Sequence, residues 1–282
     1  MEVRQPAAPH FYSGDCVRSV QQFLAGFTPP TVPEQILAGV VPHAGWQYSG
    51  AVAAQVYESI RRNDSPSTFV IFGAVHRRMD PKHAVYATGA WATPLGDVAI
   101  DEELAAAILG QTSEWAADNP QAHEEEHAIE VQLPFIRHLF PGAKIVPISV
   151  NPTEQAVPFG RRVGELLRGQ RRRAVVIGST DLTHYGEPYR FTPAGFGVRA
   201  HEWLRANDAR ILRLAEQMQA EELVPEAARH QNACGPGALA ATVAAAQTLG
   251  AERGYLLDYT TSYDVVPEPV FRMAVGYAGL LF

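Results

Sequence analysis

The sequence predicts one three-layer α/β domain spanning residues 1–282, with a central sheet that is mostly parallel or mixed. Apolar runs rich in β-branched residues alternate with helical patterns along the chain, which is typical of βα units. Several of these runs are apolar on both faces, as expected for strands that helices cover on two sides. No repeat, low-complexity tract or long linker divides the chain.

Six apolar runs are predicted as strands, and the last two are expected to pair antiparallel at an edge of the sheet. They cover residues 36–41, 68–72, 144–150, 174–177, 255–259 and 271–278. Seven segments with helical periodicity are predicted as helices. They cover residues 15–25, 50–61, 101–110, 124–139, 153–167, 198–217 and 236–249.

Polar residues at the start of three helices and one proline refine these boundaries. Asp15, Asp101 and Thr153 are predicted N-caps, because their side-chain oxygens can accept from the free amides of the first turn. Pro134 is expected to bend or end the helix over residues 124–139, since it lacks an amide hydrogen and clashes with the preceding turn.

The charge of the chain argues against a nucleic-acid partner. The formal net charge is −7, whereas neutralising phosphates requires a basic face. The one basic run, three arginines at residues 171–173, directly precedes a predicted strand and is interpreted as a solvated loop.

Hydropathy and cysteine content favour a cytoplasmic protein without a membrane partner. The N-terminus lacks the apolar segment of a secretory signal. No window reaches the roughly eighteen apolar residues that a membrane span requires. The two cysteines, Cys16 and Cys234, do not make a disulfide framework, so we expect a reducing compartment.

Histidines follow three of the predicted strands. His43 comes just after residue 41, His76 after residue 72 and His184 after residue 177. In open α/β sheets ligands bind outside the carboxyl ends of the strands, so the three imidazoles are expected to face one region. One such histidine is more often a hydrogen-bonded loop residue, but three in one chain favour a metal-binding or proton-transfer site.

Asp181 lies three residues before His184. Its carboxylate is suited to orient the imidazole and raise its basicity, as a general base requires. It is equally suited to cap a following helix. Both interpretations stay open from the residues alone.

The segment at residues 123–134 contains His123-Glu124-Glu125-Glu126-His127, which matches the zincin pattern His-Glu-x-x-His letter by letter. Three successive glutamates instead indicate an exposed helix start, where acids favour the helix dipole. His127 and Glu130 share one face of the predicted helix and are candidates for the wall of the cleft.

Cys234 stands in a turn-rich entry to an Ala-rich helix. A helix N-terminus lowers the pKa of a thiol and favours the thiolate, which can bind metal or act as a nucleophile. The alternative is a small buried apolar residue, the usual behaviour of a free cysteine and the one expected for Cys16.

The chain resembles the Memo family, also called AmmeMemoRadiSam system protein B, over nearly its whole length. Seven landmarks occur in the family's order. They are Phe11-Tyr12; Pro42-His43-Ala44-Gly45 with Tyr48-Ser49-Gly50; Gly73-Ala74-Val75-His76; Thr93-Pro94-Leu95-Gly96-Asp97; Glu126-His127-Ala128-Ile129-Glu130 with Gln132-Leu133-Pro134; Asp181-Leu182-Thr183-His184-Tyr185; and Cys234-Gly235. Ala74-Val75 depart from the Pro-Ser that the family usually has there.

The resemblance implies a fold similar to that of the class III extradiol ring-cleavage dioxygenases, which are non-haem Fe(II) enzymes. His43 and His76 take the positions of the two histidine ligands, and Cys234 stands where those enzymes have a carboxylate. His184 matches their acid/base histidine and is accompanied by Asp181. The family pattern also places His127 at the cleft.

Fe(II) is the first expectation for the metal, with Zn²⁺ or copper as alternatives because a thiolate is softer than a carboxylate. The favoured function is a dioxygenase-type oxidoreductase acting on a small, catechol-like molecule. One alternative is a zinc-dependent hydrolase. Another is a signalling protein that binds a phosphopeptide near Arg77-Arg78. A homo-oligomer is compatible with the sequence, and Cys234 is a ligand, a nucleophile or a bystander.

Overall fold

Parallel strands form the centre of a nine-stranded mixed sheet in the computed structural model, which describes residues 2–12, 14–77, 80–169 and 173–282. The nine strands are β2 (Ala38–Val41), β3 (Thr68–Gly73), β4 (His83–Val85), β7 (Ala116–Asp118), β8 (Lys144–Ser149), β9 (Ala174–Ser179), β10 (His184–Tyr185), β11 (Tyr255–Thr261) and β12 (Ala274–Leu281). Their order is β10-β12-β2-β9-β3-β8-β4-β7, and β11 pairs with β12.

The four central strands β2, β9, β3 and β8 are parallel and end level with one another. Ser179 at the end of β9 is in register with Val41 on one side and Gly73 on the other, and Gly73 is in register with Ser149. The residues that follow these strands therefore leave the sheet at the same edge, as the sequence predicts.

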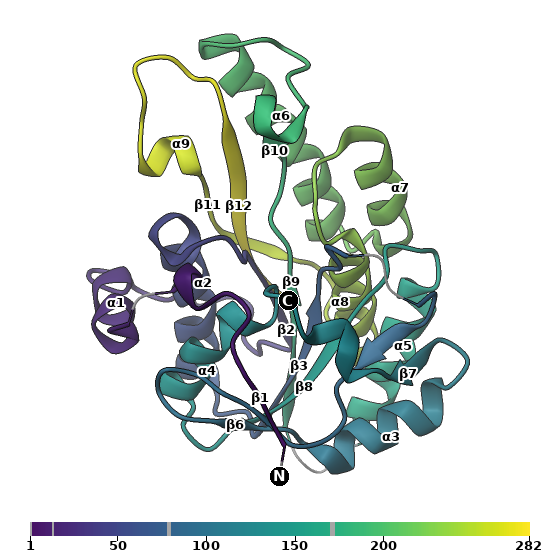
Figure 1. Ribbon diagram of the computed structural model, residues 1–282. Helices are drawn as coiled ribbons and strands as arrows, with labels where there is room; N and C mark the ends of the chain where they lie inside the picture. Colours follow the sequence, from purple (N-terminus) through teal and green to yellow (C-terminus); the bar gives the residue numbers. More distant parts are fainter. Residues whose placement is uncertain (1, 13, 78–79, 170–172) are drawn as a thin grey trace.

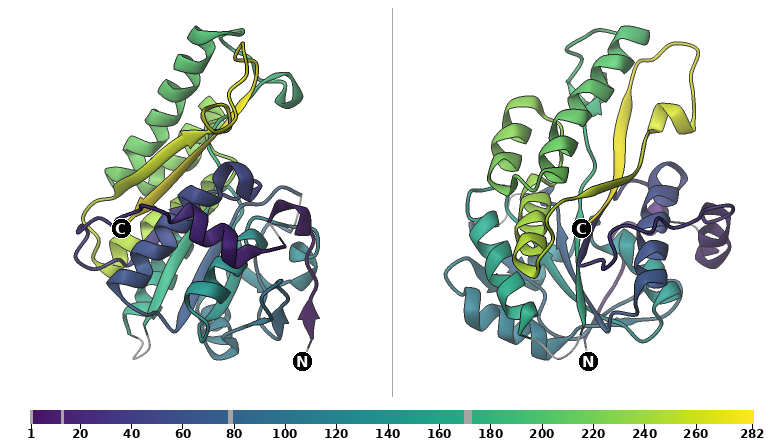
Figure 2. Two further views of the ribbon diagram at one scale, coloured as in Figure 1. Left: turned by 90° about the vertical axis from the view of Figure 1, so that its left-hand side faces the viewer. Right: turned by 180° about the vertical axis from the view of Figure 1, so that it is seen from behind.

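Helices cover both faces of this sheet and so make the predicted three-layer α/β fold. Figures 1 and 2 show α1 (Cys16–Phe23), α2 (Trp46–Asn63) and α4 (Leu133–Leu139) on one side. The other side carries α3 (Glu102–Thr112), α5 (Ala156–Arg168), α7 (Ala220–His230) and α8 (Pro236–Leu249). The longest helix, α6 (Val198–Glu216), rises beside β12, and α9 (Ser262–Val265) lies between β11 and β12.

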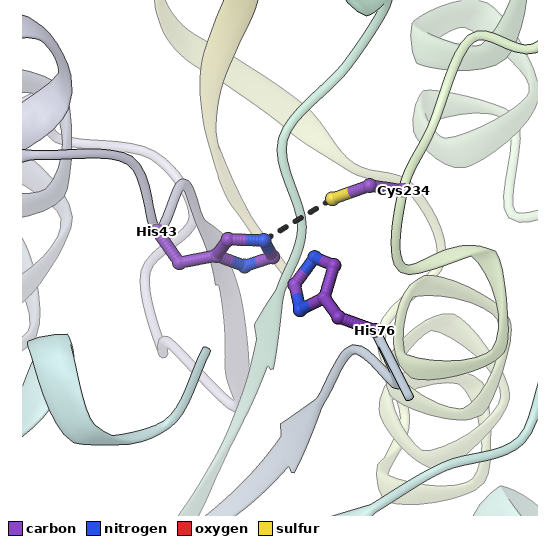
Figure 3. Close-up of side chains that lie close together, drawn as sticks. All are labelled: His43, His76 and Cys234. Atoms are coloured by element: carbon purple, nitrogen blue, oxygen red, sulfur yellow. Dashed lines mark hydrogen bonds between the residues drawn. The ribbon is translucent and has the colours of Figure 1, made fainter. Parts of the chain in front are cut away.

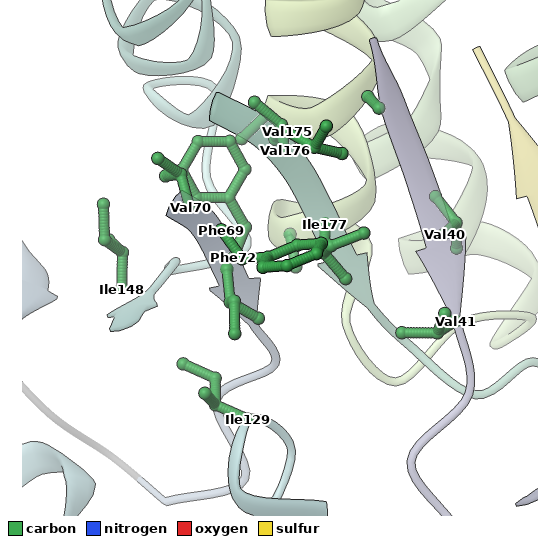
Figure 4. Packing of buried hydrophobic residues seen from close by; sticks show 14 of the residues in the cluster. Val40, Val41, Phe69, Val70, Phe72, Ile129, Ile148, Val175, Val176 and Ile177 are labelled. Carbon is green, nitrogen blue, oxygen red and sulfur yellow. The ribbon is translucent and has the colours of Figure 1, made fainter. Parts of the chain in front are cut away.

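The core lies between these layers because the central strands are apolar on both faces. Phe69, Phe72 and Ile177 are fully buried and pack with the valines of β2 and β9, as Figure 4 shows. On one face, α5 approaches α8 closely, since a Cβ atom on Gly160 would lie 2.3 Å from the carbonyl oxygen of Ala241.

The remaining strands are antiparallel or short. β12 pairs antiparallel with β2, β10 and β11, so β11 lies at an edge, as expected for one of the last two strands. A separate three-stranded sheet is formed by β1 (Val3–Arg4), β5 (Ala90–Trp91) and β6 (Val98–Ala99).

Most predicted elements are confirmed, and several predicted boundaries are wrong. The side chains of Asp15 and Asp101 cap α1 and α3 as predicted. Thr153 does not cap α5, which begins at Ala156 after Gln155. The last strand begins at Ala274 rather than residue 271, because Phe271 is buried in a separate apolar cluster.

The predicted helix over residues 124–139 is wrong in its first half. Regular α-helix begins only at Leu133, and Pro134 lies in its first turn, where a missing amide hydrogen costs nothing. Glu126 is buried, not a solvated first-turn acid, and its carboxylate accepts from the backbone amides of His127 and Ala128. Such local bonds compete with helix formation. Helices α7 and α9 and the short strands β1, β4 to β7 and β10 were not predicted from the sequence.

No α-helix within the described ranges is long and apolar enough to cross a membrane. Residues 170–172 are not described, so the loop interpretation of the arginines at 171–173 falls mainly outside the described residues.

Gly160→Ala is expected to lower the free energy of unfolding by about 1–3 kcal/mol, because the added methyl group meets the α8 backbone in a well-packed interface. Gly110→Ala is the matched control. Gly110 also lies in a helix but faces open space, so alanine there should leave stability unchanged or raise it by up to about 1 kcal/mol. Urea unfolding of both variants measures the difference, and equal stabilities would contradict the close α5–α8 packing.

Candidate metal centre

Three chain segments bring His43, His76 and Cys234 to one point at the carboxyl edge of the sheet (Figure 3). His43 follows β2, His76 follows β3, and Cys234 directly precedes Gly235, the N-cap of α8. One ligand atom from each residue lies within 4.8 Å of the others. The Sγ atom of Cys234 is 3.1 Å from Nε2 of His43.

The ring of His43 is held in one tautomer by Ser179. The hydroxyl of Ser179 donates to the carbonyl of Ala128 at 2.7 Å, so it can only accept from Nδ1 of His43, 3.0 Å away. Nδ1 therefore carries the hydrogen, and the lone pair of Nε2 faces Cys234. Burial, together with the charges of His76 and His127, holds the pKa of His43 well below its usual value.

His76 is oriented by Glu126. The ring Nδ1 of His76 lies 2.9 Å from Oε1 of Glu126, and the backbone amide of His76 donates to Oε2 at 2.9 Å. Burial alone would lower the pKa of His76, but the hydrogen bond and charge of Glu126 outweigh it and raise the pKa. Because Nδ1 is bonded to a carboxylate, Nε2 is the free nitrogen, as in metal-binding histidines that carry a carboxylate partner.

Cys234 is fixed by the backbone of Asp181. The amide of Asp181 donates to Sγ at 3.2 Å, and the amide of Cys234 donates to the carbonyl of Asp181 at 3.1 Å. Burial and the Asp181 charge raise the pKa of the Cys234 thiol. The pKa is therefore raised where the sequence predicted that the helix N-terminus would lower it, because desolvation outweighs the helix.

The carboxylate of Asp181 holds the backbone of His43 in place and does not orient the ring of His184. Its Oδ1 accepts from the backbone amide of His43 at 2.7 Å, and burial raises its pKa. No helix follows it, since β10 comes next, so the capping interpretation is wrong. Nδ1 of His184 donates to the carbonyl of Leu182 at 3.0 Å, which leaves Nε2 of His184 as a free acceptor.

His127 lies beside the candidate metal ligands, as the sequence predicts for the cleft wall. Its ring stacks on His76 with centroids 4.8 Å apart and contacts Phe11 edge-on at 4.7 Å. Burial and the neighbouring His76 lower the pKa of His127.

A cavity of about 500 Å³ opens in front of these residues. His43, His76, His127, Asp181 and His184 all line it. Aromatic side chains line much of the rest: Phe11, Tyr48, Tyr189, Tyr263 and Tyr277. Among the described residues in its wall, Asp181 and Glu268 carry carboxylates, and neither lysine nor arginine is present.

Glu130 does not face the cleft, although its spacing from His127 suggested that it would. It is buried against Arg4 at 2.9 Å and also accepts from the amides of Ala7 and Ala8 and from the Tyr12 hydroxyl. The zincin interpretation is wrong as well. His123 is fully buried, with Nε2 bonded to the carbonyl of Ala84, and no α-helix spans His123 to His127.

Sequence reasoning missed Ser179, Glu126 and the buried Arg4. Ser179 lies two residues beyond the predicted strand over residues 174–177 and offered no separate signal. Glu126 was visible only as part of the family landmark around His127, and nothing local marks Arg4 as buried.

Comparisons with known proteins place the chain beside one protein family. A model of that family, described as Memo-like protein, matches residues 4–281. A MEMO1 family protein of Pyrococcus abyssi is 37% identical over 292 residues, which is 99% of both chains. A MEMO1 family protein of Methanopyrus kandleri is 35% identical over 251 residues, 87% of this chain and 83% of the relative.

One solved structure shares the fold at low sequence identity. An uncharacterized protein of Escherichia coli K12 superposes with a TM-score of 0.53 at 12% identity and covers 86% of this chain and 99% of its own. This likeness supports the fold alone.

A buried carboxyl group holds the backbone at the residue before His184. Asp208 is fully buried and accepts from the amide of Thr183 at 2.9 Å and from the Tyr259 hydroxyl at 2.7 Å. Burial outweighs these hydrogen bonds and raises the pKa of Asp208 from 3.8 to about 7.

Asp208→Asn is expected to change how stability depends on pH. Because the folded pKa lies above the ordinary one, the bound proton stabilises the fold fully below pH 3.8, and this contribution is lost as the pH rises through about 7. The variant should therefore gain up to about 4 kcal/mol relative to wild type across this window. Urea unfolding at several pH values measures it, with the exposed Asp118→Asn as control. Parallel pH profiles for Asp208→Asn and wild type would contradict it.

Proposed function

The chain belongs to the Memo-like protein family, and from this premise we propose that His43, His76 and Cys234 hold one transition-metal ion in a dioxygenase-type oxidoreductase. Fe(II) is the first candidate, and the substrate is a small, catechol-like molecule. The observation that carries the proposal is the meeting of three ligand atoms within 4.8 Å, with Nδ1 of both histidines engaged by Ser179 or Glu126 so that Nε2 remains for a metal ion.

The donor set fits a metal ion. Ligands bound at about 2.0–2.3 Å from one ion lie a few ångströms apart, as these atoms do. Three protein ligands leave coordination positions for substrate. When bound, such an ion supplies Lewis acidity and one-electron redox chemistry. The thiolate also suits Zn²⁺ or copper, so these metals are the alternatives.

His184 is the residue proposed to take the proton of a substrate hydroxyl. Its Nδ1 is committed to the carbonyl of Leu182, so Nε2 faces the cavity as a proton acceptor. Asp181 lines the same cavity, and its carboxyl group interacts electrostatically with the ring of His184. His127 has a lowered pKa and lines the cavity as a neutral ring that packs against substrate.

A zinc-dependent hydrolase is the second candidate, because two histidines and one cysteine can hold zinc with a water in the fourth position. Phosphopeptide binding has less support. The described wall of the cavity carries no lysine or arginine, and Arg77 is paired with Glu125. Arg78 falls outside the described residues.

We place the protein in the cytoplasm, where a reducing environment keeps the Cys234 thiol available. The proposed partner is a small molecule rather than nucleic acid or membrane, in keeping with a net charge of −7. A homo-oligomer stays a prediction.

His43→Ala and Cys234→Ser are expected to lose bound metal, falling from about one equivalent per chain to about a tenth or less after anaerobic purification, because each removes one of three ligands. Elemental analysis measures the content. His138→Ala, which changes a histidine of α4 away from the cavity, is the control and should keep it.

The identity of the bound metal and the dependence of activity on oxygen distinguish the candidate functions. Iron in the wild-type protein, with oxygen uptake on a panel of catechols, supports the oxidoreductase. Zinc alone, with oxygen-independent ester or amide cleavage, supports the hydrolase. Equal metal contents in wild type and both ligand variants would contradict the proposed centre.

A further inference from the structure

Large apolar side chains on the surface are concentrated beside the mouth of the cavity. Nine large hydrophobic residues are exposed in the described part of the chain, and seven of them lie in residues 186–198 and 262–273. We call these two stretches the rim segments. Single exposed apolar residues are ordinary on protein surfaces, but a concentrated patch indicates a binding surface.

The patch continues into the cavity. The first rim segment exposes Tyr189 (42%), Phe196 (45%) and Val198 (75%). The second exposes Val265 (41%), Val266 (55%), Val270 (48%) and Met273 (48%). Tyr189, Val266 and Met273 also line the cavity, so one apolar surface runs from the inner wall to the outside.

The rim segments are anchored to each other. The amide of Gly197 donates to the carbonyl of Phe271 at 2.8 Å, and Phe271 is buried in a cluster with Tyr185 and Ala274. The guanidinium of Arg272 lies over the Phe196 ring, 5.7 Å from its centroid. Figures 1 and 2 show both stretches side by side at the same end of the molecule. The exposed side chains therefore stand on a packed base.

The charges of the cavity wall restrict the class of ligand further. The described cavity wall holds the carboxylates of Asp181 and Glu268 but no lysine or arginine that would pair with an anionic group. An anionic substituent on the ligand would meet these carboxylates and no lysine or arginine of the described wall, which disfavours its binding.

We propose that the site takes an amphiphilic aromatic diol, with a hydroxylated ring in the cavity and an uncharged alkyl substituent on the rim segments. The hydroxylated ring follows from the proposed function, on which this inference rests. The alkyl substituent on the rim segments is the new part. A small polar diol would fill part of the cavity of about 500 Å³ and leave the rim uncovered. An alkyl chain covers Val266 and Met273, which gains affinity by removing apolar surface from water.

Titration of the anaerobic, metal-loaded protein with catechol, 4-methylcatechol, 4-butylcatechol and 3,4-dihydroxybenzoate tests this. Each methylene on the rim should lower Kd about two- to four-fold, so butyl should bind at least about eight-fold more tightly than methyl. The carboxylate should bind about ten-fold more weakly than 4-methylcatechol or worse.

Matched variants locate the effect. Val266→Ser should cut the butyl-to-methyl affinity ratio to half or less, because it removes apolar rim surface. Leu256→Ser changes an equally apolar, 40% exposed residue outside the rim segments and should leave the ratio unchanged.

A Kd that stays flat along the series, or tightest binding of the carboxylate, overturns the inference. A stable dimer that Val266→Ser dissociates also overturns it, because the patch would then bind a second copy of the chain. Metal content, measured on the same preparation, reports separately on the proposed function. If metal is present but the affinity does not change along the series, only the inference about the alkyl substituent is contradicted. If no metal is bound, the proposed metal centre is contradicted.

Discussion

The hydroxyl of Ser179 has one proton, and the candidate centre depends on where that proton goes. It goes to the carbonyl of Ala128, so the hydroxyl accepts from His43 and also from the side-chain amide of Gln132. With the opposite arrangement, Nε2 of His43 would carry a hydrogen pointed at Cys234 and could not bind a cation. The register that places Ser179 between Val41 and Gly73 therefore sets both the spacing of the histidines and the chemistry of one of them.

The loop that carries Glu126 and His127 is held in place by a buried arginine instead of by the hydrogen bonds of an α-helix. Arg4 donates to the carbonyls of His123 and Glu126 and to the carboxylate of Glu130. A buried ion pair carries a large desolvation cost and adds little net stability. Here the ion pair fixes the position of the loop. Arg4 donates to backbone carbonyls of this irregular loop, which amides of an α-helix would otherwise satisfy. The loop then presents Glu126 to His76 and the ring of His127 to the cavity.

Sequence patterns predicted the layers and the edge of the sheet where the histidines gather, because parallel buried strands and strand-end loops have local signatures. They did not predict the partner of each polar group. Glu126 follows two other glutamates and looks solvated, yet it is paired with His76, fifty residues earlier in the chain. Asp181 is three residues from His184 but holds the amide of His43. The local context of Cys234 marked it as a candidate ligand or nucleophile, but its pairing with His43 and His76 came from the family resemblance. Such pairings depend on tertiary neighbours, which spacing along the chain does not report.

The placement of β12 has a consequence for synthesis on the ribosome. It is the last strand in chain order, yet it lies inside the sheet, bonded to β2 at Leu280 and Leu281 and to β10 at Ala274 and Val275. A nascent chain that has not yet reached these residues leaves one edge of β2 and the strand of His184 unpaired. Val275 and Tyr277 in β12 also form part of the cavity wall. Ligand capture in the complete cavity therefore requires that β12 has been synthesised, and a shorter nascent chain carries an open strand edge of the kind that chaperones shield.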